Sequence, residues 1–195
     1  MIESIIAFDH TTEIFFDLHR VPVLTAFFSW VTLLGDARFI IVLGLAMTLI
    51  LFRHHRSAYV GGFAIAILGS VWFSYVLKAI VARGRPLPSF AALDAPGYSF
   101  PSMHAACAVA LYGFLAYMIY KLLHPPHHRA PTIVSIMIIV ALIGFSRLYL
   151  GVHYLSDVVV GFLIGGFFLW LGMATTMYLE RQTRNALWRR WAKRF

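Results

Sequence analysis

Long apolar runs separated by short polar breaks dominate the pattern along this chain. A membrane-spanning helix needs about 20 predominantly apolar residues to cross a hydrocarbon core of about 30 Å. Four runs meet that requirement: residues 57–82, 102–123, 132–150 and 154–179. A shorter run follows the polar break 35–38, and we interpret residues 36–52 as the first span. The pattern therefore predicts an all-α integral membrane protein, a bundle of five transmembrane helices over residues 36–179.

The first 34 residues show a different pattern. Residues 2–18 alternate apolar and acidic positions in a helical rhythm, which is typical of an amphipathic helix in the membrane interface. The apolar run 22–34 would form a helix of only about 20 Å, which is too short to cross. We expect it to be a short interfacial helix; the alternative is a sixth crossing.

Composition supports a membrane protein of one domain. Of the 195 residues, 61% are hydrophobic and 12% charged, and the mean hydropathy is +0.79. A soluble domain is roughly half apolar and a quarter charged. No linker, low-complexity tract or clear repeat divides the chain, so residues 1–195 are predicted to form one domain. Acidic residues near the start argue against a cleavable signal peptide, and a lone Cys107 excludes an internal disulfide.

The basic residues predict the orientation in the membrane. A net charge of +8 would suggest nucleic acid in a soluble protein, but here the charges flank apolar runs, so we expect no nucleic-acid partner. With five spans, ten of the sixteen Lys and Arg residues fall on one side: Arg53, Arg56, Lys121, Arg129, Arg181, Arg184, Arg189, Arg190, Lys193 and Arg194. The positive-inside rule makes that side cytoplasmic.

The same orientation places the two unusual polar loops together. The tail 180–195 is predicted to be cytoplasmic and to lie on anionic inner-leaflet lipid, while loops 83–101 and 147–153 face outward. Small residues at helical spacing, such as Gly161 and Gly165, or Gly62 and Ala66, predict close helix packing in lipid.

The first polar cluster is residues 78–86, Lys-Ala-Ile-Val-Ala-Arg-Gly-Arg-Pro. Lys78 lies within the apolar register, where an unpartnered charge costs a few kcal/mol. Pro86 biases Arg85 away from helix, so the chain turns there. Snorkelling cations are the ordinary explanation, but cations on the predicted outer side favour an anionic ligand.

The second cluster, residues 99–104, lies where the outer loop enters a span. Ser102 is placed as an N-cap, and the amides of Met103 and His104 would then point out of the helix start. Such a terminus suits a phosphate group. A plain cap and an interfacial histidine are the alternatives.

The third cluster is residues 146–157, which contain Arg147, His153 and Asp157. His153 and Asp157 are four apart, so on a helix they share one face. A carboxylate in that position fixes the tautomer of a histidine and raises its basicity. The alternative is an Arg and a His that meet lipid headgroups, with Asp157 as their counter-ion. Cations, helix amides, a supported histidine and a second histidine are together the set that phosphoryl transfer requires.

These motifs resemble those of the type 2 phosphatidic acid phosphatase family, which shares them with vanadium haloperoxidases. They are Lys78 with six residues before Arg85-Pro86, then Pro101-Ser102-x-His104, then Ser146-Arg147 with five residues before His153 and three before Asp157. The resemblance covers residues 78–157. Met103 departs from the glycine of many members, which bears on pocket shape and substrate choice.

The resemblance implies a role for each matching residue. His153 attacks phosphorus, Asp157 orients it, and His104 protonates the leaving oxygen and later helps to activate water. The phosphoryl oxygens are held by four side chains and by the amides of Met103 and His104; the side chains are those of Lys78, Arg85, Ser102 and Arg147. Arg83 and Ser146 are expected as supporting or headgroup contacts. No metal or other cofactor is expected.

The predicted function is hydrolysis of a membrane lipid phosphate or diphosphate at the outer face of a bacterial inner membrane. Undecaprenyl diphosphate is the first expectation for the substrate, by analogy with family members of this size. Phosphatidylglycerophosphate, phosphatidic acid and lipid-to-lipid phosphotransfer are the alternatives within the family. A lipid transporter and a metal-dependent hydrolase using His104, His153 and Asp157 are the alternatives outside it. The sequence does not specify an oligomeric state.

Overall fold

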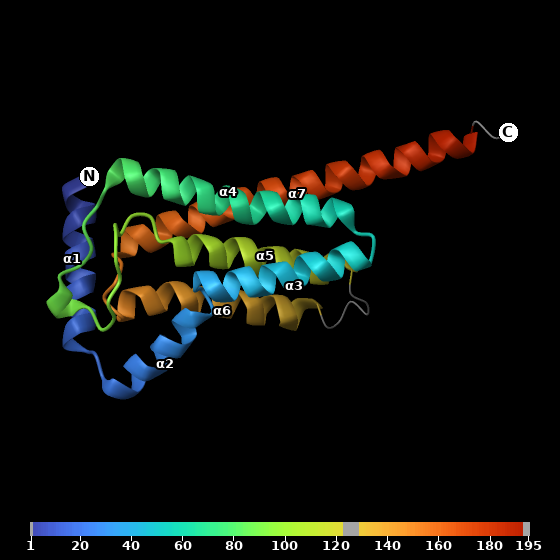
Figure 1. Cartoon of the computed structure of the whole chain (residues 1–195). Coiled ribbons are helices and arrows are strands. Elements are labelled where there is room, and N and C mark those ends of the chain that lie inside the picture. Colours follow the sequence, from blue (N-terminus) through green and yellow to red (C-terminus); the bar gives the residue numbers. More distant parts are fainter. Residues whose placement is uncertain (1, 123–128, 193–195) are drawn as a thin grey trace.

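The structure is a computed structural model that describes residues 2–122 and 129–192, and it is all-helical over those ranges (Figure 1). The elements are α1 (Ile2–Leu18), α2 (Pro22–Leu33), α3 (Ala37–Arg53), α4 (Ser57–Val81), the 3-10 turn η1 (Pro88–Phe90), α5 (Met103–Leu122), α6 (Arg129–Tyr149) and α7 (Leu155–Ala192). The predicted all-α class is confirmed.

Four helices of the described chain are long and apolar enough to cross a bilayer: α4, α5, α6 and the segment Leu155–Asn185 of α7. The four long predicted spans are therefore confirmed. The first predicted span needs a correction, because α3 passes only together with α2, from which it is bent by 40°. Counted as one broken span, this pair brings the total over the described residues to five. A separate sixth crossing by α2 is not supported, since its 12 residues reach only about 18 Å.

The break between α2 and α3 is held by polar contacts. The hydroxyl of Tyr112 donates to the carbonyl of Leu34 at 2.9 Å, and the carboxylate of Asp36 caps α3 by accepting from the amide of Arg38 at 2.9 Å. Irregular backbone inside a membrane is tolerated where protein groups satisfy it in this way. The sequence pattern showed the break but not that α2 continues the span.

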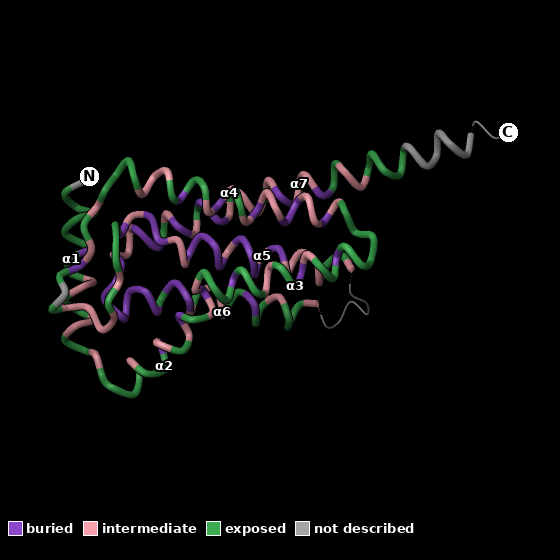
Figure 2. The backbone as a smooth tube through the Cα atoms, viewed as in Figure 1, coloured by how far each residue is buried: buried purple, intermediate pink, exposed green. Residues whose placement is uncertain are grey.

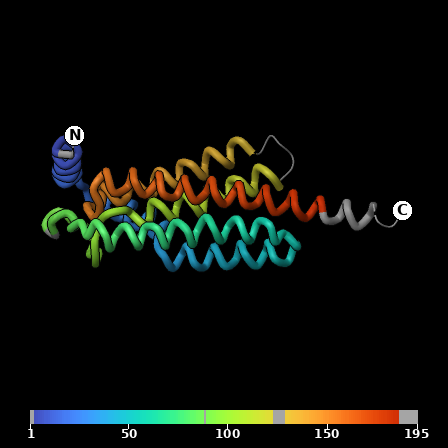
Figure 3. The backbone as a smooth tube through the Cα atoms, turned by 90° about the horizontal axis from the view of Figure 1, so that it is seen from above, coloured from blue at the N-terminus to red at the C-terminus, as the bar shows by residue number. Residues whose placement is uncertain are grey.

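Helices α4, α5 and α7 pack most closely, and small residues allow it (Figure 3). A Cβ on Gly62 of α4 would collide with Thr176 and the carbonyl oxygen of Gly172 on α7. Gly161 and Gly165 of α7 face the backbone of α5 just as closely. The predicted small-residue faces are thus the sites of helix contact.

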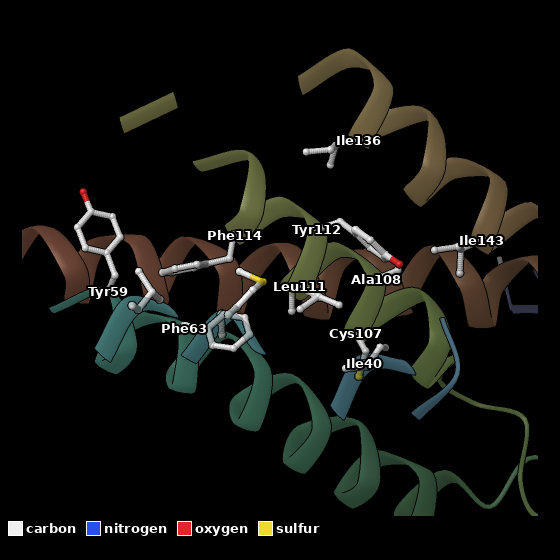
Figure 4. Packing of buried hydrophobic residues seen from close by; sticks show 14 residues of the cluster. Ile40, Tyr59, Phe63, Cys107, Ala108, Leu111, Tyr112, Phe114, Ile136 and Ile143 are labelled. Atoms are coloured by element: carbon white, nitrogen blue, oxygen red, sulfur yellow. The ribbon is translucent and has the colours of Figure 1, made fainter. Parts of the chain in front are cut away.

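The buried core surrounds α5. Figure 4 shows Phe63 from α4 and Leu111 and Phe114 from α5 packed together, and Ile143 of α6 lies further along the same cluster. The outer faces stay apolar and exposed (Figure 2), with Trp72 at 65% exposure. Exposed apolar side chains on long apolar helices are expected where lipid, not water, surrounds them.

Helix α1 lies across one end of the bundle (Figure 1). Arg20, just after α1, fastens it there by donating to the carbonyls of Phe90 at 2.8 Å and Tyr149 at 3.2 Å. Gly151 has φ +67°, and a Cβ there would collide with the carbonyl oxygen of Phe90. The apolar side chains that α1 leaves exposed, such as Phe8 and Leu18, suit the interfacial position predicted for this helix.

The polar motifs 78–86, 101–104 and 146–157 all lie at the end that α1 covers, which we call the motif end (Figure 1). The basic turns containing Arg53, Lys121 and Arg129 lie at the opposite end, as predicted. Helix α7 continues past the predicted end of its span to Ala192 and extends beyond the other helices (Figure 1). The predicted lipid contacts of the tail fall on side chains outside the described ones: Arg189, Arg190, Lys193 and Arg194.

Candidate active site

The turn that follows α4 places Arg85 beside His153, the histidine of the third motif. The helix ends at Val81, and Ala82 adopts a left-handed conformation with φ 46° that turns the chain. Nη1 of Arg85 donates to the carbonyl of Val152 at 2.7 Å and lies 3.5 Å from Nε2 of His153. The first and third motifs therefore meet at Nε2 of His153.

Lys78 and Arg85 also hold the loop that precedes α5. Nζ of Lys78 donates to the carbonyl of Tyr98 at 2.6 Å, and Nε of Arg85 donates to that of Gly97 at 3.0 Å. An ammonium has three donors and a guanidinium five, so both groups retain donors for a ligand. Burial lowers the pKa of Arg85, but the group remains a cation.

Ser102 is the N-cap predicted for α5. The serine is fully buried, and its hydroxyl accepts from the amide of Ala105 at 3.5 Å. Its own amide donates to the backbone carbonyl of Asp157 at 3.0 Å, which ties the start of α5 to the start of α7. The next two amides of the first turn, those of Met103 and His104, are the ones that a bound anion would meet.

His153 and Asp157 are in contact, but not in the predicted way. Both are buried, and Nδ1 of His153 lies 3.4 Å from Oδ2 of Asp157. The expectation that they share one face of a helix is wrong, because α7 begins at Leu155 and His153 lies in the preceding turn. Asp157 reaches back from the first turn, where Oδ2 also accepts from the amide of Tyr154 at 3.0 Å. This is the geometry of a capping box, in which a side chain three residues into the helix returns to the cap.

The environment of His153 keeps its ring neutral at pH 7. Burial lowers the pKa of His153 to about 4; the hydrogen bond to Asp157 opposes this shift, and the nearby charges of Arg147 and Arg85 add to it. A neutral imidazole retains a lone pair on one nitrogen. With Nδ1 directed at Asp157, that lone pair belongs to Nε2, beside Arg85.

Arg147 supplies a buried guanidinium from the end of α6. The residue is 6% exposed, and Nη1 donates to the hydroxyl of Thr32 on α2 at 2.6 Å. Nε is buried and has no hydrogen-bond partner among the described residues. A buried donor of this kind is uncommon in a folded protein, and it is available to an acceptor group of a ligand. Thr32 is a site residue that the sequence did not indicate.

Asp157 has a second partner that the sequence only partly anticipated. Nη1 of Arg83 donates to Oδ1 of Asp157 at 2.9 Å, and Nη2 donates to Asp9 of α1 at 2.8 Å. Burial lowers the pKa of Arg83, but the two carboxylates outweigh it and raise the pKa overall. Arg83 was expected as a supporting residue; Asp9 was not. The hydroxyl of Ser146, also expected as support, donates to Ile143 within its own helix at 2.6 Å.

His104 lies at the end of an apolar groove. The groove has a volume of about 510 Å³ and runs between α3, α4 and α5, with Ile40, Phe63 and Met103 among its lining residues. A second hollow has a volume of about 370 Å³ and is lined by Arg85 and the turn at Gly151–Val152. Of the residues predicted as a site, Met103 and His104 thus line the apolar groove, and Arg85 lines the hollow.

The chain matches a known protein family. A family model described as the PAP2 superfamily matches residues 63–181, which contain all three motifs. The chain belongs to the PAP2 superfamily. The family predicted from the motifs is confirmed.

Several bacterial proteins are similar to this PAP2 protein. Phosphatidylglycerophosphatase B of Bacillus subtilis is 32% identical over 157 residues, which are 76% of this chain and 73% of that relative. The crystal structure of a transmembrane PAP2-type phosphatidylglycerolphosphate phosphatase from Bacillus subtilis matches with a TM-score of 0.79, at 27% identity over 88% of this chain and 85% of that one. LpxE of Aquifex aeolicus matches with a TM-score of 0.63, at 27% identity over 84% of this chain and 92% of that one.

Proposed function

We propose that this PAP2 protein hydrolyses the terminal phosphate of a glycerophospholipid, phosphatidylglycerophosphate foremost, with His153 as the nucleophile. The observation that carries the proposal is the position of His153: Nδ1 faces a buried carboxylate and Nε2 faces Arg85, in a cluster with three cations. An imidazole oriented in this way has its lone pair directed to where a bound phosphate would lie.

The first step forms a bond between Nε2 of His153 and phosphorus and breaks the bond between phosphorus and the lipid oxygen. His104, as general acid, gives its proton to that leaving oxygen. The ring of His153 becomes positively charged because Nδ1 keeps its proton, and Asp157 stabilises that charge. In the second step His104, now neutral, takes a proton from water as the water oxygen bonds to phosphorus. The bond between phosphorus and Nε2 of His153 breaks, which returns the ring to its neutral form and releases inorganic phosphate.

The cations stabilise the charge that spreads over the phosphoryl oxygens. Arg85 lies beside the attacking nitrogen, Nε of Arg147 has no partner among the described residues, and Lys78 keeps one of its three donors. The amides of Met103 and His104 complete the cradle, with Ser102 fixing the helix start. Preorganised donors of this kind are worth several kcal/mol in a site from which water is excluded.

The groove beside His104 supplies a place for the lipid. Its walls are almost entirely apolar, and its position between α3 and α4 at the edge of the bundle suits a chain arriving from the bilayer. His104 lies at the end of this groove, on the side where the lipid leaving group would be. The general acid is thus on the lipid side of the phosphate, and Arg85 is on the side of the outer hollow.

The choice of substrate rests on the relatives. A phosphatidylglycerophosphatase is matched over about three quarters of both chains, and a structure of the same activity matches with a high TM-score. These matches favour phosphatidylglycerophosphate over undecaprenyl diphosphate, which was the first expectation from the sequence. The alternatives that the test compares are phosphatidic acid or undecaprenyl diphosphate as the substrate, and transfer of the phosphate to another lipid in place of water. From the positive-inside rule we further propose that the motif end faces the extracytoplasmic side and the C-terminus the cytoplasm.

A phosphate-release panel on the purified protein tests the proposal. Phosphatidylglycerophosphate, undecaprenyl diphosphate, phosphatidic acid and diacylglycerol diphosphate would be compared with and without EDTA. We expect the highest kcat/KM on phosphatidylglycerophosphate, retained in EDTA and lost in His153→Ala. His19→Ala, which removes an exposed histidine of the same end, is the matched control. Turnover that survives in His153→Ala would overturn the proposal, and loss of turnover in EDTA would restore the metal-dependent alternative.

A further inference from the structure

Asp9 is a buried carboxylate on α1, whose other described residues are exposed or partly exposed, and the proposed chemistry leaves it without a role. It is 2% exposed, although α1 lies across the end of the bundle. Oδ1 accepts from the amide of Ser156 at 2.9 Å, and Oδ2 accepts from the Ser156 hydroxyl at 2.5 Å. Both partners lie in the first turn of α7, one residue before Asp157.

Arg83 connects this carboxylate to the active site. One terminal nitrogen donates to Asp9 at 2.8 Å, and the other donates to Asp157 at 2.9 Å and to the Ser156 hydroxyl at 2.7 Å. The face of the guanidinium rests on the ring of Tyr154, 4.0 Å from its centroid. Arg83 thus bridges two carboxylates with side-chain exposures of 2% and 0%.

The charges in this network explain why two carboxylates are present. Asp157 paired with Arg83 alone would be a neutral pair, and its field at His153 would be weak. Asp9 takes a share of the Arg83 charge and leaves the three groups with a net charge of −1. When His153 becomes positively charged on bonding to phosphorus, the four groups together are neutral, which a buried site favours.

We propose that Asp9 is a positioning residue of the active site, which acts through Arg83 on Asp157 and so on His153. The interfacial helix α1 is then part of the catalytic apparatus and not only a membrane anchor. The inference rests on the proposed function, because it assigns Asp9 to the support of the nucleophile named there.

A purely structural role for Asp9 is separable from this one. Asp9 also receives an amide at the start of α7, and its loss could simply loosen α1. Asp17→Asn is the matched control, because Asp17 lies on the same helix and pairs with Arg20 at 3.3 Å, away from Asp157. A loosening of α1 affects both variants, whereas a change in the field at His153 affects only Asp9→Asn.

The experiment is a double-mutant cycle on the purified full chain, with lipid phosphate turnover and vanadate binding as two readouts. Vanadate mimics the transferred phosphoryl group and needs no assumption about the lipid. We expect Asp9→Asn to lower kcat about tenfold with KM within twofold, and to weaken vanadate binding by a similar factor. Asp9→Glu should recover part of the loss, and Asp17→Asn should change neither readout by more than twofold. In an Arg83→Gln background, Asp9→Asn should have no further effect.

Other outcomes overturn the inference in distinguishable ways. If the wild-type protein is active in both readouts and Asp9→Asn is unaffected, or affected as much as Asp17→Asn, then Asp9 is not a positioning residue. The proposed function stands in that case. An undiminished effect of Asp9→Asn in the Arg83→Gln background shows that Asp9 does not act through Arg83. A wild-type protein that neither releases phosphate nor binds vanadate removes the proposed function, and the role of Asp9 with it.

Discussion

Nδ1 of His153 lies 3.4 Å from Oδ2 of Asp157, and the two side chains belong to different local structures. The ring is in the turn after α6, whereas the carboxylate is in the first turn of α7. Asp157 therefore both caps the start of α7 and orients the ring of His153. Because the same oxygen accepts from the amide of Tyr154, formation of α7 sets the direction of the imidazole.

Asp157→Asn should nearly abolish turnover while leaving the fold intact. An amide can still accept from Tyr154, but it no longer selects the proton on Nδ1 or stabilises a charged ring. We expect kcat to fall by up to about 10⁴-fold, the loss known when the carboxylate that orients a catalytic histidine is made neutral. Steady-state kinetics measures the loss. Glu180→Gln, at the opposite end of the bundle, should be unaffected, and a loss below threefold at Asp157 would argue against its role.

The lowered pKa of His153 makes stability depend on pH in a defined window. The folded pKa is about 4 and the unfolded value 6.5, so the unfolded chain binds more protons between those values. Stability is therefore fully present above pH 6.5 and falls as the pH falls towards 4, by about 2 kcal/mol at pH 5.

The measurement is the apparent Tm in detergent at pH 7.5 and pH 5. Wild type should lose a few degrees more than His153→Asn, which has no titrating ring. The two proteins differ only in this ring, so the difference between the two drops gives its contribution. An equal drop in the two proteins would show that His153 is not buried as a neutral ring.

A bulky side chain in the apolar groove should lower kcat/KM for long-chain lipids more than for short substrates. Ala64 lines the groove between α3 and α4, and Ala64→Trp would occupy much of it. We expect kcat/KM for a long-chain lipid phosphate to fall at least tenfold, while that for a short soluble phosphate ester stays within threefold. Ala141→Trp places the same side chain on an exposed position of α6 and is the control. An equal loss on both substrates would mean that the groove does not hold the lipid.

Arg147 should be needed both for charge and for geometry. Arg147→Gln removes a buried cation whose Nε has no partner among the described residues, and we expect kcat/KM to fall at least 100-fold. Thr32→Val removes only the hydroxyl that accepts from Nη1 at 2.6 Å, so a loss of about tenfold is expected. Arg53→Gln, an exposed cation at the opposite end, is the comparison. Equal phosphate release by Arg147→Gln and Arg53→Gln would contradict the assignment.

Much of the fold was predictable because lipid imposes simple rules. Apolar length located four spans, and small residues marked the faces along which α4, α5 and α7 pack. The break after α2 was visible in the sequence as polar residues. The way the bent pair α2–α3 is held was not, because it depends on Tyr112 of α5, whose hydroxyl donates to the carbonyl of Leu34. Such a contact leaves no trace in local sequence pattern.

Some residues of the candidate site could likewise be predicted from the sequence, and others could not. His104, His153 and Asp157 could be found because they lie in short motifs at helix ends. Thr32 and Asp9 could not, because their partners Arg147 and Arg83 lie 115 and 74 residues away in the sequence. Asp9 in particular looks like its acidic neighbours on α1, and only the tertiary fold buries it.

The most direct test of the central claim is to trap the enzyme during turnover. The purified protein would be mixed with lipid substrate carrying ³²P in its terminal phosphate, quenched within one turnover, and digested under alkaline conditions that preserve phosphohistidine. The account predicts acid-labile label on the peptide that contains His153, absent in His153→Asn and much reduced in Asp157→Asn. Rapid phosphate release with no label on His153, or label on any other residue, would contradict it.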